Sequence, residues 1–248
     1  MPVLVVVPAR LGSTRLPRKP LQPLGGVPLI VRVAQRIQSL GVADRLIIAT
    51  DAAEIASVAA AAGFEASLTR PDHPSGSDRV HEISCRPEFS RYDEILNVQG
   101  DSPFVTAPAL QGALSQIRRG FDLGTAAVPL DPADAGNPAV VKVVMDDRGR
   151  ALYFSRLPIP FRETDAGGEC RWRHLGVYAY TSRALERFAA AAPSALERAE
   201  RLEQLRALEL GLSIGVERLR EPARPAVDTL EDLHQAQAQW TVTQEVTR

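Results

Sequence analysis

The stretch VLVVVPARLGSTRLPRKPLQPLGGVPL, residues 3–29, predicts how the chain begins to fold. Its first five residues, 3–7, are apolar and mostly β-branched, which is typical of a short strand buried on both faces rather than of a helix. After Gly25 and Gly26 the apolar residues take helical spacing, and Pro28 stands where a first helical turn accepts proline. The stretch therefore predicts a strand, a polar loop and a helix, the opening of an α/β fold.

The loop between this strand and this helix concentrates positive charge. Its cations are Arg10, Arg15, Arg18 and Lys19, and they are mixed with glycine, proline and hydroxyl side chains. Open α/β sheets bind ligands at the carboxyl ends of their strands, and backbone N–H groups, hydroxyls and fixed cations suit a polyanion. The residues predict a triphosphate-binding loop. The alternative is a basic surface loop, since neither GxxxxGK[ST] nor GxGxxG occurs here.

The letters PARLGSTRLPRKPL, residues 8–21, resemble the signature loop of the sugar nucleotidyltransferases. The resemblance is greatest to PARxxSTRLPxKPL of the 3-deoxy-manno-octulosonate (Kdo) cytidylyltransferases. It implies a nucleotide site, with Arg10 and Lys19 also taking part in catalysis. The residues that it assigns to the nucleotide from this loop are Pro8, Ala9, Arg10, Ser13, Thr14, Arg15 and Lys19. Arg18 stands where that family usually has glycine, and this replacement costs local backbone freedom and adds a charge beside Lys19.

Composition excludes several classes of protein. The 29 basic and 30 acidic residues leave a formal net charge of −1, which argues against a nucleic-acid-binding protein. No apolar run approaches the roughly 18 residues of a membrane-spanning helix, and the first residues lack the pattern of a secretory signal. Cys85 and Cys170 lie outside any metal-ligand spacing, so we expect reduced thiols in a cytoplasmic protein that does not insert into a membrane.

The next segment continues the α/β alternation. Residues 45–49 and 65–68 are expected strands, and the alanine-rich residues 52–62 between them are an expected helix that Gly63 ends. Because the connections are short, this alternation indicates a mostly parallel sheet with right-handed crossovers.

A second polar loop follows, TRPDHPSGSDR at residues 69–79, and a helix is expected at about 78–85. The loop resembles the TRxDHxSGT[ED]R segment of the Kdo cytidylyltransferases. The resemblance implies that Arg70, Ser75 and Gly76 line the nucleotide site. The alternative is a turn-rich connection without a ligand.

EILNVQGD, residues 94–101, combines an expected buried strand with a polar turn at its carboxyl end. There Asp101 could hold Mg²⁺, which prefers one or two carboxylates together with substrate phosphates. Gln99 offers the donor and the acceptor that a pyrimidine edge requires. An aspartate in this position is more often a turn former or helix cap, but NVQGD resembles NVQGDEP of the same family. Ser102 stands where that family usually has glutamate.

An antiparallel part is expected after these motifs. A helix at 107–119 and a strand at 123–130 precede two apolar runs, 140–145 and 151–154, that flank the turn DDRG. That spacing predicts a β-hairpin. Lys142 alternates with valines, so we expect it to face solvent or to lie at a sheet edge.

The motifs ALYFSR and RHLGVY, which end at Arg156 and Tyr178, also recur in the Kdo cytidylyltransferases. Residues 171–180 are an expected strand. The resemblance implies that Arg156, His174 and Tyr178 face the carboxylate and hydroxyls of the acceptor sugar. A histidine in a strand is otherwise more often a structural residue.

Residues 196–210 have the amphipathic pattern of one helix, in which Glu203 and Gln204 are expected to be exposed. LEQLR within it also recurs in the family, and this implies that Glu203 and Gln204 belong to the sugar site. A strand at 212–219 is expected next.

VDTLEDL near the carboxyl end resembles VDTPEDL of the family, whose aspartate is a second metal ligand. The corresponding residue here is Asp228. Thr229 is a natural N-cap for an expected helix at about 230–240, and Leu230 replaces the family's proline.

These features predict an α/β fold: a Rossmann-like, mostly parallel sheet with helices on both faces, plus a smaller antiparallel subdomain. We expect one nucleotidyltransferase domain over residues 1–248, with a nucleotide-binding half at about 1–130, a sugar-binding and antiparallel part at about 131–220, and a returning segment at 221–248. The family is commonly dimeric, which implies a homodimer.

The resemblance implies transfer of CMP from CTP to Kdo for lipopolysaccharide synthesis, with Mg²⁺ held by Asp101 and Asp228. One alternative keeps the reaction and changes the acceptor to 8-amino-3,8-dideoxy-manno-octulosonate or another keto sugar acid. A second alternative is an inactive nucleotide-binding regulatory module. Only the replacements at Arg18 and Ser102 favour it, and the presence of both aspartates counts against it.

Overall fold

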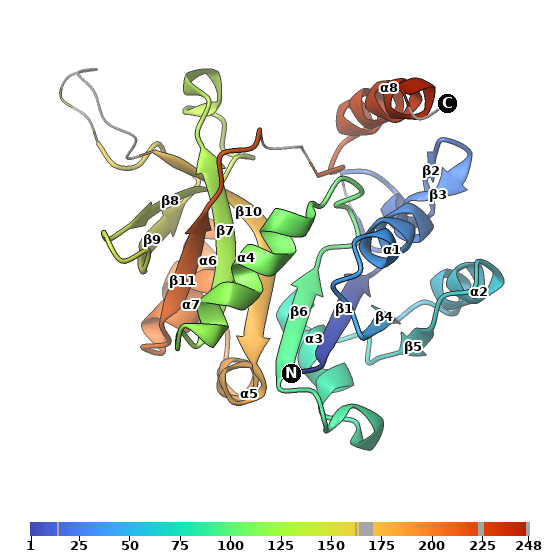
Figure 1. The fold of residues 1–248 in the computed structure, drawn as a ribbon, viewed down its shortest axis with the longest axis horizontal. Helices are drawn as coiled ribbons and strands as arrows, with labels where there is room; N and C mark the ends of the chain where they lie inside the picture. Colours follow the sequence, from blue (N-terminus) through green and yellow to red (C-terminus); the bar gives the residue numbers. More distant parts are fainter. Residues whose placement is uncertain (14, 162, 164–170, 223–225, 247–248) are drawn as a thin grey trace. The chain divides into compact units, whose positions relative to one another are not determined.

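The computed structural model describes residues 1–13, 15–161, 163, 171–222 and 226–246 (Figure 1). Its backbone contacts divide the chain into two compact units. Unit 1 comprises Met1–Tyr92, Asn97–Thr106 and Arg224–Arg248, and unit 2 comprises Asp93–Leu96 and Ala107–Ala223. Within the described ranges, no helix is both long enough and apolar enough to cross a membrane.

Unit 1 contains parallel strands at the positions that the apolar runs predict. They are β1 (Val3–Ala9), β4 (Arg45–Thr50), β5 (Ala66–Leu68) and the end of β6 (Glu94–Val98). Their order is β6-β1-β4-β5, and β4 is parallel to both β1 and β5. Every residue of β1 is buried, as expected for a strand with elements packed on both faces.

The helices of unit 1 are α1 (Leu29–Ser39), α2 (Ala53–Ala61), α3 (Gly76–Ser84) and α8 (Leu230–Val246), with short 3-10 turns at Lys19–Leu21 and Pro87–Phe89. Pro28 does not lie in the first turn of α1 but directly before it, as the N-cap. Pro28 lies in β3 (Val27–Pro28), which pairs with β2 (Pro23–Leu24). Gly25 and Gly26 form the tip of this hairpin with φ of +57° and +76°, a conformation that glycine adopts without strain.

Helix α8 packs on this hairpin through an apolar cluster. The cluster consists of Leu16, Leu24, Leu29, Val227, Leu233 and Ala236, with Phe104 and Trp240 against it. Gly25 is required here, because a side-chain carbon at this position would lie 2.6 Å from the Trp240 ring. The carboxyl-terminal helix is thereby attached to the segment that follows the cationic loop.

Unit 2 is built on a mixed sheet. Its strands are β7 (Leu123–Pro129), β8 (Lys142–Met145), β9 (Ala151–Ser155), β10 (Trp172–Thr181), β11 (Ile214–Arg218) and the beginning of β6. The order is β11-β7-β10-β6, with β11 parallel and β10 antiparallel to β7. The predicted hairpin is confirmed, since β8 pairs antiparallel with β9 and also with β10. The predicted fold class, a mostly parallel sheet with helices and an antiparallel addition, is thus confirmed.

The helices of unit 2 are α4 (Ala107–Arg118), α5 (Ser182–Ala189), α6 (Ala195–Glu200) and α7 (Gln204–Glu209), with a 3-10 turn at Pro132–Asp134. The single helix predicted for 196–210 was wrong. Arg201 has φ of +54° and ends α6 in the left-handed region. The buried Arg206 then joins the two short helices through two 2.7 Å hydrogen bonds to the carboxylate of Glu197. A buried bidentate pair of this kind resists rearrangement into one continuous helix.

The expectation for Lys142 was also wrong. Its side chain is fully buried, and Nζ donates to the carbonyl oxygens of Asn137 (2.9 Å), Val140 (2.7 Å) and Arg156 (2.6 Å). An ammonium group has three donors and no acceptor, so these three carbonyls satisfy it completely. Burial, followed by the charge of Arg156, lowers the pKa of Lys142.

Candidate functional site

Two aspartates that are 127 positions apart in the sequence meet at one ammonium group in unit 1. Lys19 Nζ donates to Asp101 Oδ2 at 2.5 Å and to Asp228 Oδ1 at 2.9 Å. The three side chains are 16%, 19% and 34% exposed, respectively. Burial lowers the pKa of Lys19, but the charges and hydrogen bonds of the two carboxylates outweigh burial and raise it. Lys19 is therefore a permanent cation between two anions.

Backbone hydrogen bonds fix this meeting. The Val227 N–H donates to the Asp101 carbonyl oxygen at 2.8 Å, which ties the two segments directly. Asp232 Oδ2 accepts from the N–H groups of Asp228 and Thr229, at 3.0 and 2.8 Å, and Thr229 Oγ1 accepts from Asp232 N at 3.1 Å. This reciprocal capping confirms Thr229 as the N-cap, and it holds Asp228 immediately before α8.

The pair of carboxylates fits the oxygen chemistry of a magnesium site. Two carboxylates that both reach one ammonium atom can also approach one cation, and Mg²⁺ usually takes one or two carboxylates and completes its shell with water and substrate phosphates. Over the residues described, no group of three or more histidine, cysteine, aspartate or glutamate side chains comes together. The donor set thus suits a cation shared with a phosphorylated ligand better than a closed structural metal site.

The remaining cations of the loop surround this cluster unequally. Arg15 forms a 3.2 Å ion pair with Asp228 and is 60% exposed. Arg10 is exposed, and it has no ion pair among the residues that the structure describes. Ser13 Oγ accepts from Leu16 N at 3.4 Å. Thr14 lies outside the described residues.

Arg18 explains why glycine suits its position in the resembling family. Its φ of +53° lies in the left-handed region, where a side chain is strained and glycine is not. The Arg18 guanidinium forms an ion pair with Glu54 of α2. The structure thus places a left-handed turn immediately before Lys19.

Three further predicted nucleotide residues lie side by side. A side-chain carbon at Gly76 would lie 3.4 Å from Pro8 Cγ and 3.4 Å from Gln99 Nε2. Gln99 Nε2 donates to Asn97 Oδ1 at 3.1 Å, which fixes the orientation of the amide. Ser75 is the N-cap of α3, with Oγ accepting from Asp78 N at 3.3 Å. The ends of β1 and β6 and the start of α3 therefore converge, as the motifs predict.

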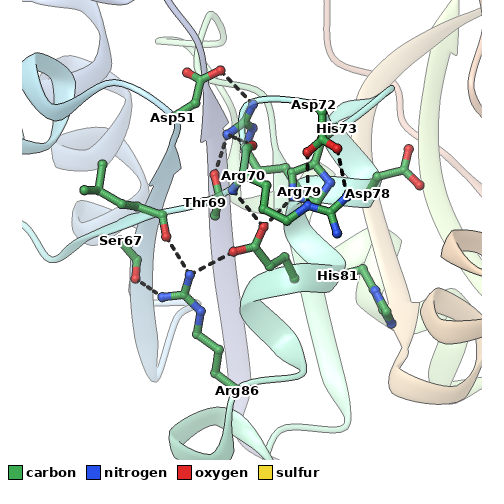
Figure 2. A network of polar contacts seen from close by, with 12 residues as sticks. Asp51, Ser67, Thr69, Arg70, Asp72, His73, Asp78, Arg79, His81 and Arg86 are labelled. Carbon is green, nitrogen blue, oxygen red and sulfur yellow. Dashed lines mark hydrogen bonds and ion pairs between the residues drawn. The ribbon is translucent and has the colours of Figure 1, made fainter.

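Arg70 projects from the loop before α3 (Figure 2). Its side chain is 68% exposed and pairs with Asp72 at 3.0 Å. Sequence reasoning assigned no role to two α3 side chains that contact this loop, Arg79 and Glu82. Their signal was a cation and an anion three positions apart on one helix, since residues with that spacing share a face.

The residues predicted for the sugar lie in unit 2, where a bulge brings two of them together. The register of β10 against β7 shifts between Leu175 and Tyr178. As a result, the ring centroids of His174 and Tyr178 are 5.2 Å apart, whereas four residues of regular strand span about 13 Å. Thr125 Oγ1 fills the bulge and donates to the Val177 carbonyl at 2.7 Å.

His174 is neutral in this environment. Its Nε2 lies 2.9 Å from Thr125 Oγ1. The Thr125 hydroxyl also lies 2.7 Å from the Val177 carbonyl and 3.2 Å from the Leu175 carbonyl. When it gives its one proton to either carbonyl, His174 Nε2 is the donor toward Oγ1. Burial lowers the pKa of His174 to about 3. Burial, followed by the charge of Glu203, raises the pKa of Tyr178 well above its ordinary value. Both rings thus offer neutral hydrogen-bonding groups.

The other predicted sugar residues are less exposed than expected. Gln204 is buried at the start of α7, and Glu203 is half-buried at its N-cap. Arg156 uses its guanidinium on three carbonyl oxygens: those of Glu200 (2.8 Å), Pro138 (2.8 Å) and Arg201 (3.3 Å). The prediction that Glu203 and Gln204 are ordinary exposed residues of one helix was therefore wrong, and their role in sugar binding stays a prediction.

A cytidylyltransferase family model matches residues 4–214. Three curated relatives carry the name 3-deoxy-manno-octulosonate cytidylyltransferase. The one from Gemmatimonas aurantiaca is 51% identical and covers 98% of this chain and 95% of its own. The one from Leptothrix cholodnii is 46% identical, with 92% and 88% covered. The one from Herminiimonas arsenicoxydans is 44% identical, with 97% and 100% covered.

Two solved structures are also similar. A CMP:2-keto-3-deoxy-manno-octonic acid synthetase complexed with CTP superposes with a TM-score of 0.89 at 34% identity, covering 99% of this chain and all of the other. A cytidylyltransferase from Leptospira borgpetersenii has a TM-score of 0.60 at 14% identity, covering 96% and 86%. The second likeness concerns the fold alone.

Proposed function

Because this chain belongs to the family of 3-deoxy-manno-octulosonate cytidylyltransferases, we propose that it transfers CMP from CTP to Kdo and releases pyrophosphate. The product, CMP-Kdo, is an activated sugar for lipopolysaccharide synthesis. The observation that carries the proposal is the convergence of Lys19, Asp101 and Asp228, because a cation and two carboxylates from distant segments suit a triphosphate and its counter-ion.

The reaction exchanges one bond to the α-phosphorus for another, and the attacking hydroxyl releases its proton to water. The anomeric hydroxyl oxygen of Kdo attacks the α-phosphorus of CTP, and the bond from this phosphorus to the oxygen that bridges the α- and β-phosphates breaks. The oxygen takes both electrons of that bond and leaves as part of pyrophosphate. Arg10, Arg15 and Lys19 neutralise the charge that grows on this leaving group, and they hold the triphosphate in line with the acceptor.

Asp101 and Asp228 are the residues that would hold Mg²⁺. When bound, Mg²⁺ supplies positive charge against the phosphates and makes the attacking hydroxyl more acidic. In the free protein Lys19 supplies the compensating charge instead, because its ammonium contacts both carboxylates. A cation held by Asp101 and Asp228 would leave this ammonium available to contact a phosphate oxygen.

Unit 1 also provides the nucleotide contacts in this proposal. Gln99, beside Gly76 and Pro8, offers an amide whose orientation Asn97 fixes, which suits a pyrimidine edge. Arg70 and Ser75 contribute from the neighbouring loop.

Unit 2 provides the sugar contacts. Tyr178 and His174 are neutral and buried, so they suit hydroxyl groups rather than a carboxylate. Glu203 and Gln204 add acceptors and an amide. Arg156, whose guanidinium donates to three carbonyl oxygens, adds positive charge toward the sugar acid. The same proposal includes three further points: the domain is divided into nucleotide, sugar and returning parts, the protein is cytoplasmic, and it forms a homodimer.

Pyrophosphate release tests the proposal. The purified protein is incubated with CTP, Mg²⁺ and either Kdo or its 8-amino analogue, and the two kcat/KM values are compared. We expect release with Kdo at the higher kcat/KM. A higher value for the amino analogue would reassign the acceptor. No release with either sugar would leave another keto sugar acid as the acceptor, or the nucleotide-binding module as the function.

A further inference from the structure

The main chain of Arg70 is held from both sides by side chains of helix α3. Its N–H donates to Glu82 Oε2 at 3.0 Å, and its carbonyl oxygen accepts from Arg79 Nη1 at 3.3 Å. Arg79 and Glu82 are three positions apart, so both project from one face of the helix. The Glu82 carboxylate accepts from the Arg70 N–H, and the Arg79 guanidinium donates to the Arg70 carbonyl oxygen. Both hydrogen bonds are therefore charge-assisted.

Each of these two side chains is fixed by further contacts (Figure 2). Arg79 also donates to Thr69 Oγ1 and, at 3.1 Å, to Asp51 Oδ2. Glu82 also accepts from His73 Nε2 at 2.5 Å and from Arg86 Nη2 at 3.1 Å. Arg79 and Glu82 together form a clamp on the Arg70 backbone, and their hydrogen bonds join the ends of β4 and β5 to α3.

Burial divides this region into a fixed support and an accessible head group. The Arg79 side chain is 4% exposed, whereas that of Arg70 is 68% exposed. Burial raises the pKa of Glu82, but the hydrogen bonds from the Arg70 amide, His73 and Arg86 outweigh burial and lower it. The carboxylate is therefore ionised at neutral pH, while the Arg70 guanidinium has only the exposed Asp72 as its ion-pair partner among the described residues.

We propose that Glu82 and Arg79 are positioning residues that hold the backbone of Arg70, so that its exposed guanidinium is presented to CTP. This inference rests on the proposed function. A long flexible side chain loses less entropy on binding when the peptide that carries it is already fixed. A small displacement of the binding group also weakens its interaction with the ligand strongly. Glu82 and Arg79 touch no substrate in this arrangement and act only through Arg70.

Four variants test the inference by steady-state kinetics: Arg70→Ala, Glu82→Ala, Glu82→Gln and the double variant Arg70→Ala/Glu82→Ala. Loss of a charge-assisted hydrogen bond predicts that Glu82→Ala raises KM for CTP about tenfold, with kcat and KM for Kdo within about twofold of the wild type. Glu82→Gln keeps an acceptor for the Arg70 amide, and we expect it to restore part of the loss.

The double variant separates positioning from an independent effect. If Glu82 acts through Arg70, removal of Glu82 from a protein that already lacks the Arg70 side chain leaves KM for CTP within about twofold of Arg70→Ala. A double variant whose KM equals the product of the two single effects would overturn the inference. An unchanged KM in Glu82→Ala, or in Arg70→Ala, would overturn it as well.

Two controls accompany these variants. Glu65→Gln removes a glutamate that pairs with Arg45 in the same unit and lies outside the loop, and it should leave every kinetic constant unchanged. The thermal midpoint of each variant identifies unfolding: equal losses in kcat and both KM values with a lowered midpoint would show a structural role and overturn positioning. Turnover by the wild type tests the proposed function separately, so the two proposals can fail independently.

Discussion

Of the 29 basic residues in this chain only two are lysines, Lys19 in unit 1 and Lys142 in unit 2. Each gathers several oxygen acceptors around one ammonium, which a planar guanidinium does less readily. Lys19 is partly exposed and contacts two carboxylates. Lys142 is fully buried and contacts three backbone carbonyls. The ammonium of Lys19 can exchange its carboxylate partners for an anionic ligand. The ammonium of Lys142 stabilises the fold, because all its contacts are to backbone carbonyls.

Two of the arginines predicted to bind substrates, Arg70 and Arg156, differ in the same way. Both backbones are clamped alike, because Glu200 accepts from Arg156 N at 3.0 Å and Lys142 donates to its carbonyl, just as Glu82 and Arg79 hold Arg70. The Arg70 guanidinium is exposed, but that of Arg156 is occupied by three carbonyls. In both comparisons the accessible cation is the one in unit 1, and the cation held by carbonyl oxygens of the fold is the one in unit 2.

The largest effect is expected for Asp101→Asn, which removes one negative partner of Lys19. The amide is a poor ligand for Mg²⁺, and loss of several kcal/mol of charge stabilisation predicts that kcat falls at least about 100-fold. The free energy of unfolding in urea should change little, because Lys19 keeps Asp228. A variant with near-normal turnover would remove Asp101 from the proposed metal site.

Lys142→Met tests the buried lysine of the comparison between Lys19 and Lys142. Three buried carbonyls lose their donor, and we expect the free energy of unfolding to fall by about 3 kcal/mol. The urea midpoint measures this change, provided that the m-value is unchanged. The folded variant should retain its KM for CTP. A large rise in that KM without loss of stability would contradict a purely structural Lys142.

Lys19→Met sharpens the contrast, because it should affect binding first. Loss of a charged contact to phosphate predicts that KM for CTP rises about 10- to 100-fold, with a much smaller change in KM for Kdo. Asp101 and Asp228 are also left without their common cation, so Mg²⁺ alone should raise the thermal midpoint of the variant more than that of the wild type. Equal losses for both substrates would argue against a phosphate role.

The neutral His174 of unit 2 predicts that the free energy of unfolding depends on pH. Its pKa is lowered from 6.5 to about 3 on folding, so the unfolded chain binds the proton more readily between these values. Stability from this group is therefore fully present above pH 6.5 and falls with decreasing pH, by up to about 1.4 kcal/mol per unit. The groups around the ring are Thr125, Phe154 and Tyr178.

Urea unfolding at several pH values measures this dependence. His174→Gln, which keeps a donor toward Thr125, should show a weaker decline than the wild type between pH 6.5 and 4. Identical slopes would show that the histidine is accessible to protons in the folded state.

The smallest effect is expected for Arg18→Gly. Relief of the left-handed backbone should stabilise the protein by about 1 kcal/mol, and loss of the exposed pair with Glu54 offsets part of it. We expect a small rise in the urea midpoint and unchanged kinetic constants. A fall in the midpoint would show that the ion pair outweighs the strain.

Much of the fold could be predicted because its signals are local. The apolar run of β1 and the glycine after α2 mark their elements directly, and several motifs in order indicated the family, which the comparisons confirm. Motifs also selected Asp101 and Asp228, whose meeting at Lys19 the structure shows. Their assignment as metal ligands stays a prediction.

Other features depend on contacts that a linear pattern does not contain. The alternation around Lys142 indicates a strand but not what covers each face, so burial could not be inferred. Arg201 adopts a left-handed conformation without the glycine that usually marks it. The bulge of β10 did have a signal, since an isolated Gly176 in a strand pattern often marks one.

The hydrogen bond from Val227 N to the Asp101 carbonyl oxygen affects when the site can form during synthesis of the chain. Chains emerge from the ribosome amino end first, and a nascent chain carries Lys19 and Asp101 long before residue 228 is made. The proposed catalyst is thus assembled only after residue 228 has been made. A ribosome-bound fragment could bury β1 and β4 and yet consume no CTP.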